Sequence, residues 1–263
     1  MMSSVSRRAD GEPRFVSQGV VAANSERMVG GLSACIWPST SSTLASVSIR
    51  LRPLVVVTAL SAACLPGFPE RAPSTSVVVD DFSDVAIAQR YRHEGGSWRV
   101  LDGGLHTVGD RNQPLWSNVV LPENVRIEFT SVSSTPAVDM KVEIFGDGVR
   151  HESGYIAIVG GWNNTLTVIA RLDEHEPSRA TKRTRFEPGR RYRWRIERTD
   201  GRTIKLFIDD ELQIAYDDKA PLYGPRNNRF AFSGWESEVV FDDLKITPVA
   251  STDAPPGSPA ARP

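Results

Sequence analysis

The sequence lacks several features that would quickly narrow down its function. It has only two cysteines, Cys35 and Cys64, and both lie in the N-terminal quarter, so no disulfide framework is available to the rest of the chain. Its 31 basic and 32 acidic residues give a formal net charge of −1. Nucleic-acid-binding proteins normally carry a clear basic excess, so we expect no nucleic-acid partner.

Catalytic and metal-binding motifs are equally scarce. The four histidines, His93, His106, His151 and His175, are scattered without HxH or HExxH spacing, so a catalytic zinc site is not expected. There is no Gly-rich phosphate loop, no Ser-His-Asp elbow and no CxxC pair. The sequence therefore predicts no cofactor, with a structural calcium ion as the one alternative considered below.

Apolar runs are short. Leu54–Leu60 is apolar, follows Arg50 and Arg52, and precedes small residues before Cys64. A membrane-spanning helix needs about 20 apolar residues, so this run predicts a signal peptide rather than an anchor. It resembles a bacterial lipoprotein signal, which is cut before a cysteine that is then lipidated. Ser61 stands where such signals usually have Leu or Val, and an ordinary secretory signal is the alternative.

These features divide the chain into segments. The first 47 residues are either a mis-assigned start, with Val47 as initiator, or a disordered extension. We expect a monomer that is exported to the cell envelope and lipid-anchored to a membrane, on the periplasmic or surface side. The predicted segments are an extension (1–47), a lipoprotein-type signal peptide (48–64), a Pro/Ser tether (65–76), one folded domain (77–249) and a disordered tail (250–263).

The stretch from Arg190 to Tyr216 carries the strongest structural signal. Its apolar residues alternate with charged ones: Tyr192, Trp194 and Ile196 fall on one face of a strand, and the residues between them fall on the other. Asp200-Gly201 then supplies turn residues before a second alternating run. Such alternation is typical of an antiparallel sheet that is covered on one side, so the sequence predicts an all-β fold.

Similar runs recur along the whole domain, and no long amphipathic helix interrupts them. So many strands at a spacing of roughly 10 residues imply a sandwich of two antiparallel sheets. The predicted strands are Val77–Phe82, Trp98–Leu101, Gly104–Thr107, Leu115–Asn118, Val125–Ser133, Met140–Phe145, Tyr155–Gly160, Leu166–Ala170, Tyr192–Arg198, Thr203–Ile208, Gln213–Tyr216, Arg229–Trp235 and Val239–Thr247.

The order of these pieces carries a family resemblance. DDFSD opens the domain at Asp80, an xWxVxDGxL hairpin follows at Trp98–Leu105, a PGxxYRWRIxR strand ends at Arg198, and FDDLKI closes it at Phe241–Ile246. From Asp80 to Pro248 the chain resembles the concanavalin A-like lectin/glucanase superfamily, the laminin-G-like jelly roll. It is especially similar to a bacterial branch of 3-keto-disaccharide hydrolase-like domains. The resemblance implies a fold shared by lectins, hydrolases, lyases and adhesive modules, so it does not fix the function.

In such jelly rolls the concave sheet and its rim loops usually form the site, which implies a carbohydrate or polysaccharide partner. Aromatic rings stack on a sugar ring, while amide, carboxylate and guanidinium groups bind its hydroxyls. Packing in the core and salt bridges such as Arg171–Asp173 are the structural alternatives. The candidate ligand-binding residues are Arg111, Trp116, Glu152, Tyr155, Trp162, Asn163, Arg171, Asp173, Tyr223 and Trp235.

We therefore expect a non-catalytic glycan-binding module, with two alternatives. The first is a glycoside or keto-sugar hydrolase or lyase with Glu152 and Asp173 as acid and base, although no ExDxxE pattern occurs. The second is a structural adhesion module. A calcium ion could bind at Asp81, Asp242 and Asp243, because the first and last strands are adjacent in this fold.

Overall fold

A computed structural model of the protein describes residues 71–252. The extension, the signal peptide with Cys64, most of the tether and residues 253–263 lie outside the described residues, so those assignments stay predictions. Within residues 71–252, no helix is long and apolar enough to cross a membrane.

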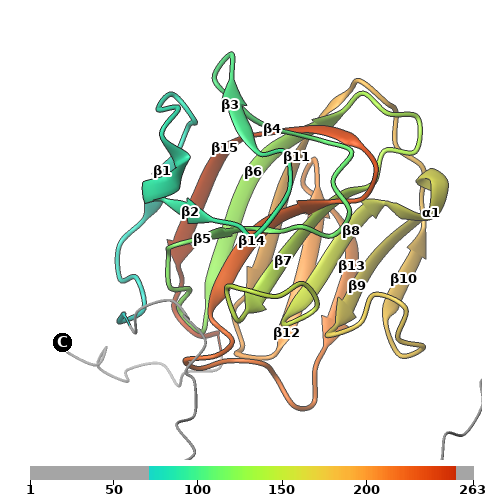
Figure 1. Cartoon of the computed structure of the whole chain (residues 1–263). Helices are drawn as coiled ribbons and strands as arrows, with labels where there is room; N and C mark the ends of the chain where they lie inside the picture. Colours follow the sequence, from blue (N-terminus) through green and yellow to red (C-terminus); the bar gives the residue numbers. More distant parts are fainter. Residues whose placement is uncertain (1–70, 253–263) are drawn as a thin grey trace, which may run out of the picture. The chain divides into compact units, whose positions relative to one another are not determined.

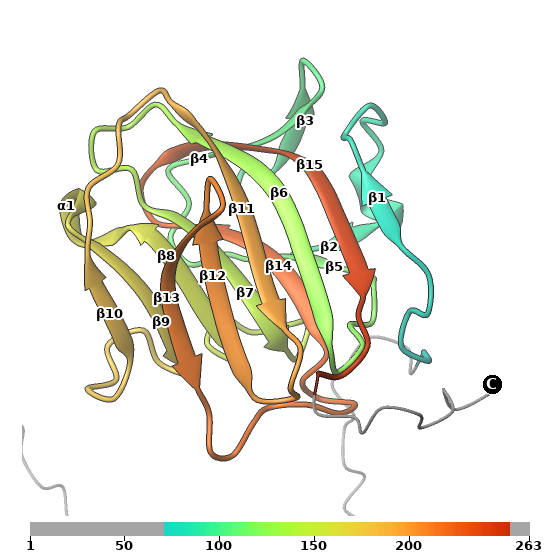
Figure 2. The same ribbon diagram turned by 180° about the vertical axis from the view of Figure 1, so that it is seen from behind.

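Two antiparallel sheets lie face to face (Figures 1 and 2). One sheet has eight strands. Seven of them follow one another in a single order, and the eighth, β1 (Val78–Asp80), lies outside that order and pairs with β15. The order of the seven is β13 (Glu211–Asp217), β12 (Thr203–Ile208), β11 (Arg191–Arg198), β6 (Val125–Ser133), β15 (Glu238–Pro248), β4 (Gly104–Val108) and β3 (Arg99–Leu101).

The seven-stranded sheet covers the other side of the core. Apart from the strands, the described residues form only a 3₁₀ turn, η1 (Ile87–Gln89), and a four-residue turn, α1 (Gly161–Asn164). The strand order is β10 (Ala180–Arg183), β9 (Leu166–Arg171), β8 (Tyr155–Gly160), β7 (Met140–Gly146), β14 (Arg229–Gly234), β5 (Leu115–Ser117) and β2 (Tyr91–Arg92).

This architecture confirms the predicted all-β, two-sheet sandwich. All thirteen predicted strands are present, with their ends within two residues of the predicted ones. The sequence missed β2 and β10. The first has only two residues, and the second, with the sequence ATKR, lies at a sheet edge without an alternating apolar pattern.

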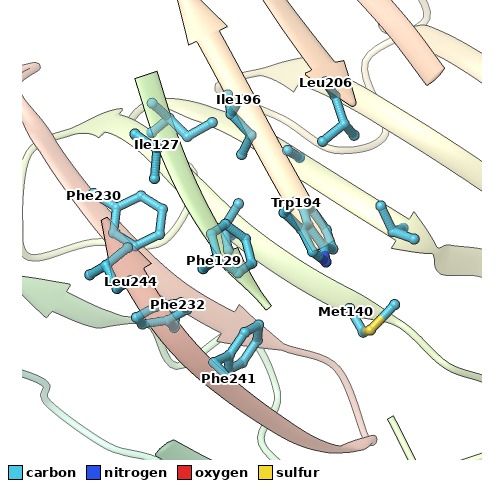
Figure 3. Packing of buried hydrophobic residues seen from close by; sticks show 14 of the residues in the cluster. Ile127, Phe129, Met140, Trp194, Ile196, Leu206, Phe230, Phe232, Phe241 and Leu244 are labelled. Atoms are coloured by element: carbon cyan, nitrogen blue, oxygen red, sulfur yellow. The ribbon is translucent and has the colours of Figure 1, made fainter. Parts of the chain in front are cut away.

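The inner faces of the two sheets form one aromatic-rich core (Figure 3). Phe129 of β6 stacks on Trp194 of β11 with ring centroids 5.0 Å apart, and Phe232 of β14 lies edge-on to Phe129 at 5.6 Å. The predicted alternation of β11 is confirmed, because Tyr192, Trp194 and Ile196 are buried there. This packing fixes the register of both sheets, since a one-residue slip would turn each apolar face outward.

The outer face of the seven-stranded sheet is also largely buried. Ile156 and Ile158 of β8 pack with Val168 and Ala170 of β9 into a second apolar cluster, separate from the core between the sheets. β8 and β9 are therefore apolar on both faces. Polar side chains that reach this face from neighbouring strands are consequently shielded from water.

Candidate ligand-binding site

A pocket of about 440 Å³ lies on the outer face of the seven-stranded sheet. It collects side chains from β7, β8, the turn α1 and the loops beside them. Its lining consists of Asn112, Ala137, Asp139, Lys141, Ile158, Trp162, Asn163, Glu174, His175, Trp235 and Glu236.

The floor of the pocket is built around Lys141. Alternation along β7 sends Met140 and Val142 into the core and Lys141 to the outer face, where its side chain is 1% exposed. Its ammonium donates to Glu174 Oε2 at 2.6 Å and to Asn112 Oδ1 at 2.7 Å. A buried ammonium needs such partners, and this one ties together three segments that are far apart in the sequence.

Trp162 forms one wall. It sits in α1, where Trp162, Asn163 and Asn164 all have positive φ angles of 51–57°. Asn tolerates this left-handed conformation, but a bulky residue such as Trp rarely adopts it. The Arg179 guanidinium lies 5.4 Å from the Trp162 ring and His175 meets that ring edge-on. The strained turn thus positions a half-buried indole at the pocket.

Trp235 directly follows β14, lines the pocket and is 41% exposed. Arg111 lies over its ring at 5.9 Å and forms an ion pair with Glu236. Residues Arg111 and Trp235 are also joined by an isolated backbone bridge. The two tryptophans that line the pocket therefore come from loops that follow different strands.

Asp139 lies beside Lys141 at the pocket wall. Its Oδ1 atom is buried and has no hydrogen-bond partner. Burial raises the pKa of Asp139 to about 6; the Lys141 ammonium lowers it and the Glu174 carboxylate raises it, so burial dominates. The pocket thus contains one carboxyl that can take up a proton near neutral pH.

A network of acidic groups continues from the floor along β7. Glu143 is fully buried and accepts a hydrogen bond from His151 Nδ1 at 2.7 Å. Glu143 also accepts from the Glu152 backbone N–H, and Glu152 Oε1 accepts from the Glu174 N–H at 3.2 Å. Burial raises the pKa of Glu143, although the hydrogen bond from His151 opposes that rise.

Several buried polar atoms on this face have no partner. Ser233 pairs across the strands with Lys141, and Trp116 pairs with Ala231, which itself lies opposite Glu143, so alternation places these residues on the outer face. Ser233 Oγ and Trp116 Nε1 are nevertheless unpartnered. Unpaired buried polar groups are uncommon in folded proteins. Their presence here is typical of a surface that binds a polar ligand or water.

The structure brings together only some of the predicted residues. Trp162, Asn163 and Trp235 line the pocket, and Arg111 adjoins it through Glu236. Glu152 joins the acidic network behind the floor.

The other predicted residues lie elsewhere. Trp116 is 1% exposed and closely approaches Gly146, so no sugar can stack on it. Tyr155 faces the core, and its hydroxyl donates to Asp218 at 2.7 Å, as does Arg171 at 2.9 Å. Tyr223 packs edge-on to Phe145 at 6.2 Å.

The structural alternative for Arg171 and Asp173, a salt bridge between them, is wrong. Strand β9 ends at Arg171, and Leu172 has a positive φ of 65°, so Asp173 does not continue the strand face. Asp173 instead accepts from the His175 N–H in a turn, while Arg171 binds Asp218.

Sequence reasoning missed the central residues Asp139, Lys141, Glu174, Asn112 and Glu236. One signal could have found Lys141. Strand β8, YIAIVG, is apolar at every position, which indicates a sheet covered on both faces. A lysine and a glutamate on the alternating positions of the preceding strand, MKVEIFG, therefore had to be buried and paired.

The predicted calcium ligands have other partners. Asp81 accepts from Ser83, Asp242 pairs with Arg191, and Asp242 also accepts from the Asp243 N–H. The first and last strands are adjacent, as predicted. Among residues 71–252, no group of three or more His, Cys, Asp or Glu side chains could hold a metal ion. Calcium binding stays a prediction.

A second pocket, of about 360 Å³, lies beside β1 and β2. Asp80 in its lining accepts hydrogen bonds from Arg90 and from the Tyr91 hydroxyl. The rest of its lining is mainly apolar, including Val78, Val120 and Leu244. Arg90 Nε is a buried polar atom without a hydrogen-bond partner here, and the lining contains no tryptophan, unlike that of the first pocket.

Comparisons by sequence find no relatives: no protein-family model matches the chain, and no curated protein matches it. Solved structures do match. The chain is similar to the carbohydrate-binding module CBM66 from Bacillus subtilis, with 18% identity and a TM-score of 0.51, over 59% of this chain and 94% of that one.

Two glucanases are also similar. One is a prokaryotic beta-1,3-1,4-glucanase (lichenase) derived from a mouse hindgut metagenome, with 10% identity and a TM-score of 0.50, over 66% of this chain and 100% of that chain. The other is the Bacillus licheniformis beta-glucanase, with 8% identity and a TM-score of 0.50, over 66% and 98%. At these identities the likeness concerns the fold. The domain has the two-sheet jelly-roll fold that the sequence resemblance implied, which confirms that expectation.

Proposed function

We propose that the protein binds a carbohydrate in the pocket between Trp162 and Trp235, without transforming it. One observation carries the proposal: two accessible indole rings line a pocket whose floor holds fixed, buried polar groups. Indole rings stack on the C–H face of a pyranose, and the amide and carboxylate groups of Asn112 and Glu174 are suited to sugar hydroxyls. The carbohydrate-binding module and the glucanases that share the fold support the carbohydrate as the ligand class.

The arrangement of the floor also supports binding. Lys141 and Glu174 are held by each other and by Asn112, so they are oriented before a ligand arrives. Pre-organised groups lose little freedom on binding, which favours affinity. An adhesion module, by contrast, would need an exposed apolar patch and no aromatic-lined pocket.

The test is a screen of the protein against neutral oligosaccharides, followed by calorimetry on each hit. Trp162→Ala and Trp235→Ala should each weaken binding about tenfold or more, because each removes a stacking ring. Tyr223→Ala is the matched control, since Tyr223 is 38% exposed but lies outside the pocket. Equal loss in all three variants, or no binding to any oligosaccharide, would contradict the proposal.

A hydrolase is the second candidate, and one observation favours it. Asp139 and Glu174 both line the pocket and have different environments: burial raises the pKa of Asp139, whereas Lys141 holds Glu174 as an ion pair. Acid and base in glycoside hydrolysis are separated in this way. Glu152 and Asp173, the pair predicted from sequence, do not line the pocket. Product release from a bound oligosaccharide, abolished by Glu174→Gln, would favour hydrolysis.

We also propose that the protein is exported and anchored to a membrane of the cell envelope through a lipid on Cys64. The supporting observation is the sequence before that residue, with two arginines, an apolar run and small residues. Labelling cells with a radioactive fatty acid should mark the protein, and Cys64→Ala should abolish the label. Label retained in the variant would contradict the anchor.

A further inference from the structure

Asp139 differs from the other charged residues that line the pocket. Glu174 is paired with Lys141 and Glu236 with Arg111, whereas Asp139 Oδ1 is buried with no hydrogen-bond partner. A buried carboxylate oxygen without a donor is costly. Such an atom is expected where a ligand supplies the donor.

The backbone holds Asp139 firmly in this position. Val138 and Asp139 have positive φ angles of 62° and 37°, and the Asp139 N–H is bonded to the Ala137 and Gly160 carbonyls. A β-branched residue such as Val138 rarely adopts this conformation, and such strain gathers at functional sites. The two backbone hydrogen bonds therefore fix the point from which the Asp139 side chain extends into the pocket wall.

The charge around Asp139 favours a cation. Two carboxylates, Asp139 and Glu174, face a single ammonium, Lys141, which is already bound to Glu174 and Asn112. The remaining carboxylate in the lining, Glu236, is balanced by the adjoining Arg111, and His175 contributes a ring at the edge of Trp162. One negative charge is left without a counterpart.

We propose that Asp139 makes this pocket selective for glycans that carry a protonated amine, that is, amino sugars without an N-acetyl group. This inference rests on the proposed carbohydrate binding and names its ligand class. An ammonium supplies both the missing donor and the missing charge, whereas a hydroxyl supplies only the donor. Indole faces also attract cations. The carboxylate of a uronic acid, by contrast, would be repelled by the unpaired carboxylate of Asp139.

The test uses three β-1,4-linked tetrasaccharides with the same backbone, built from glucose, glucosamine or N-acetylglucosamine. Calorimetry near pH 6.8 should show the glucosamine tetramer binding about tenfold more tightly than the glucose tetramer, as one charge-assisted hydrogen bond implies. Acetylation removes the positive charge, so the N-acetylglucosamine tetramer should lose this advantage.

Two substitutions separate the charge of Asp139 from its shape. Asp139→Asn keeps the size of the side chain and should abolish the preference for glucosamine, so that the glucosamine and glucose tetramers bind the variant with equal affinity. Asp210→Asn removes a carboxylate in the turn between β12 and β13 of the opposite sheet, paired with Arg193. It should leave the preference intact and so controls for a general loss of negative charge.

The pH dependence gives an independent readout. Because burial raises the pKa of Asp139 to about 6, the carboxylate forms as the pH rises from about 5 to about 7. The advantage of the glucosamine tetramer should grow over that range in the wild-type protein and stay flat in Asp139→Asn.

The outcomes are distinguishable. If the glucose and glucosamine tetramers bind equally, or if the preference survives in Asp139→Asn, the inference is overturned while carbohydrate binding stands. If the glucosamine tetramer does not bind at all, the inference is overturned as well. The proposal of carbohydrate binding itself is contradicted only if no oligosaccharide of the wider neutral panel binds either.

Discussion

Residues alternate between the inner and outer faces in both sheets, but the charged residues on the two outer faces differ in their exposure to water. On β11 of the eight-stranded sheet, Arg193 pairs with Asp210 in water, with side-chain exposures of 68% and 67%. On β7 of the seven-stranded sheet, Lys141 pairs with Glu174 at exposures of 1% and 10%. One face carries solvated ion pairs, and the other carries buried ones beneath a pocket.

This difference separates charges that keep a surface soluble from charges that form a site. Exposed ion pairs contribute little to stability, so any similar set of charges could occupy the outer face of the eight-stranded sheet. Buried charged pairs are often less stabilising than apolar residues of the same size. Their retention under the pocket, beside unpartnered atoms of Asp139 and Ser233, is best explained by a ligand.

The largest expected effect comes from breaking the buried pair. Lys141→Met leaves Glu174 and Asn112 without their donor, so we expect the free energy of unfolding to fall by about 3 kcal/mol. Urea denaturation measures the change. The double variant Lys141→Met/Glu174→Gln removes the unpaired charge and should recover about half of the loss. A single variant as stable as the wild type would show that the pair is not a structural unit.

The next prediction concerns Asp139, whose replacement should raise the free energy of unfolding rather than lower it. Burial raises the pKa of Asp139 to about 6, so the folded protein holds its proton more tightly than the unfolded chain does. Stability from this group is therefore present at low pH and is lost as the pH rises from about 4 to about 6. Asp139→Asn should raise the free energy of unfolding by about 2 kcal/mol at pH 7 and change it little near pH 4.

Asp200, in the turn between β11 and β12, is the matched control for that prediction. Burial alone would raise its pKa, but hydrogen bonds from Thr203 and the Arg202 N–H outweigh burial and lower it. Its contribution is therefore present above the unfolded pKa and lost as the pH falls. Asp200→Asn should destabilise the protein at neutral pH. If both variants changed stability in the same direction, the distinction between a site carboxyl and a structural one would fail.

The smallest effect belongs to the solvated face. Arg193→Met breaks an ion pair that is exposed at both ends, so the free energy of unfolding should change by less than about 1 kcal/mol. High salt should make wild type and variant still more alike. A loss as large as that of Lys141→Met, measured by the same urea denaturation, would erase the contrast between the two faces.

The fold was largely predictable because its signals are local. Tyr192, Trp194 and Ile196 alternate with charged residues, and Asp200-Gly201 marks the turn, so each strand carries its own pattern. The short strands β2 and β10 were not predicted, because pairing with neighbouring strands, rather than a pattern in their own residues, makes them strands.

The site was only partly predictable, because it depends on contacts between distant segments. Trp162 and Trp235 were found from residue type, but nothing in the sequence joins Lys141 to Glu174, 33 positions away. Nor could residue type separate Trp162 from Trp116, which the packing against Gly146 buries. The left-handed backbone at Trp162 likewise follows from tertiary packing, since bulky aromatic residues rarely adopt it.

The central claim is that the outer face of the seven-stranded sheet binds a carbohydrate between its two accessible tryptophans. Nuclear magnetic resonance of ¹⁵N-labelled protein, titrated with the tightest-binding oligosaccharide of the panel, tests it most directly. The indole N–H signals of Trp162 and Trp235 should shift, while that of Trp194, which donates to Ser131 in the core, should not. Shifts confined to the outer face of the eight-stranded sheet, with both pocket indoles unchanged, would contradict the claim.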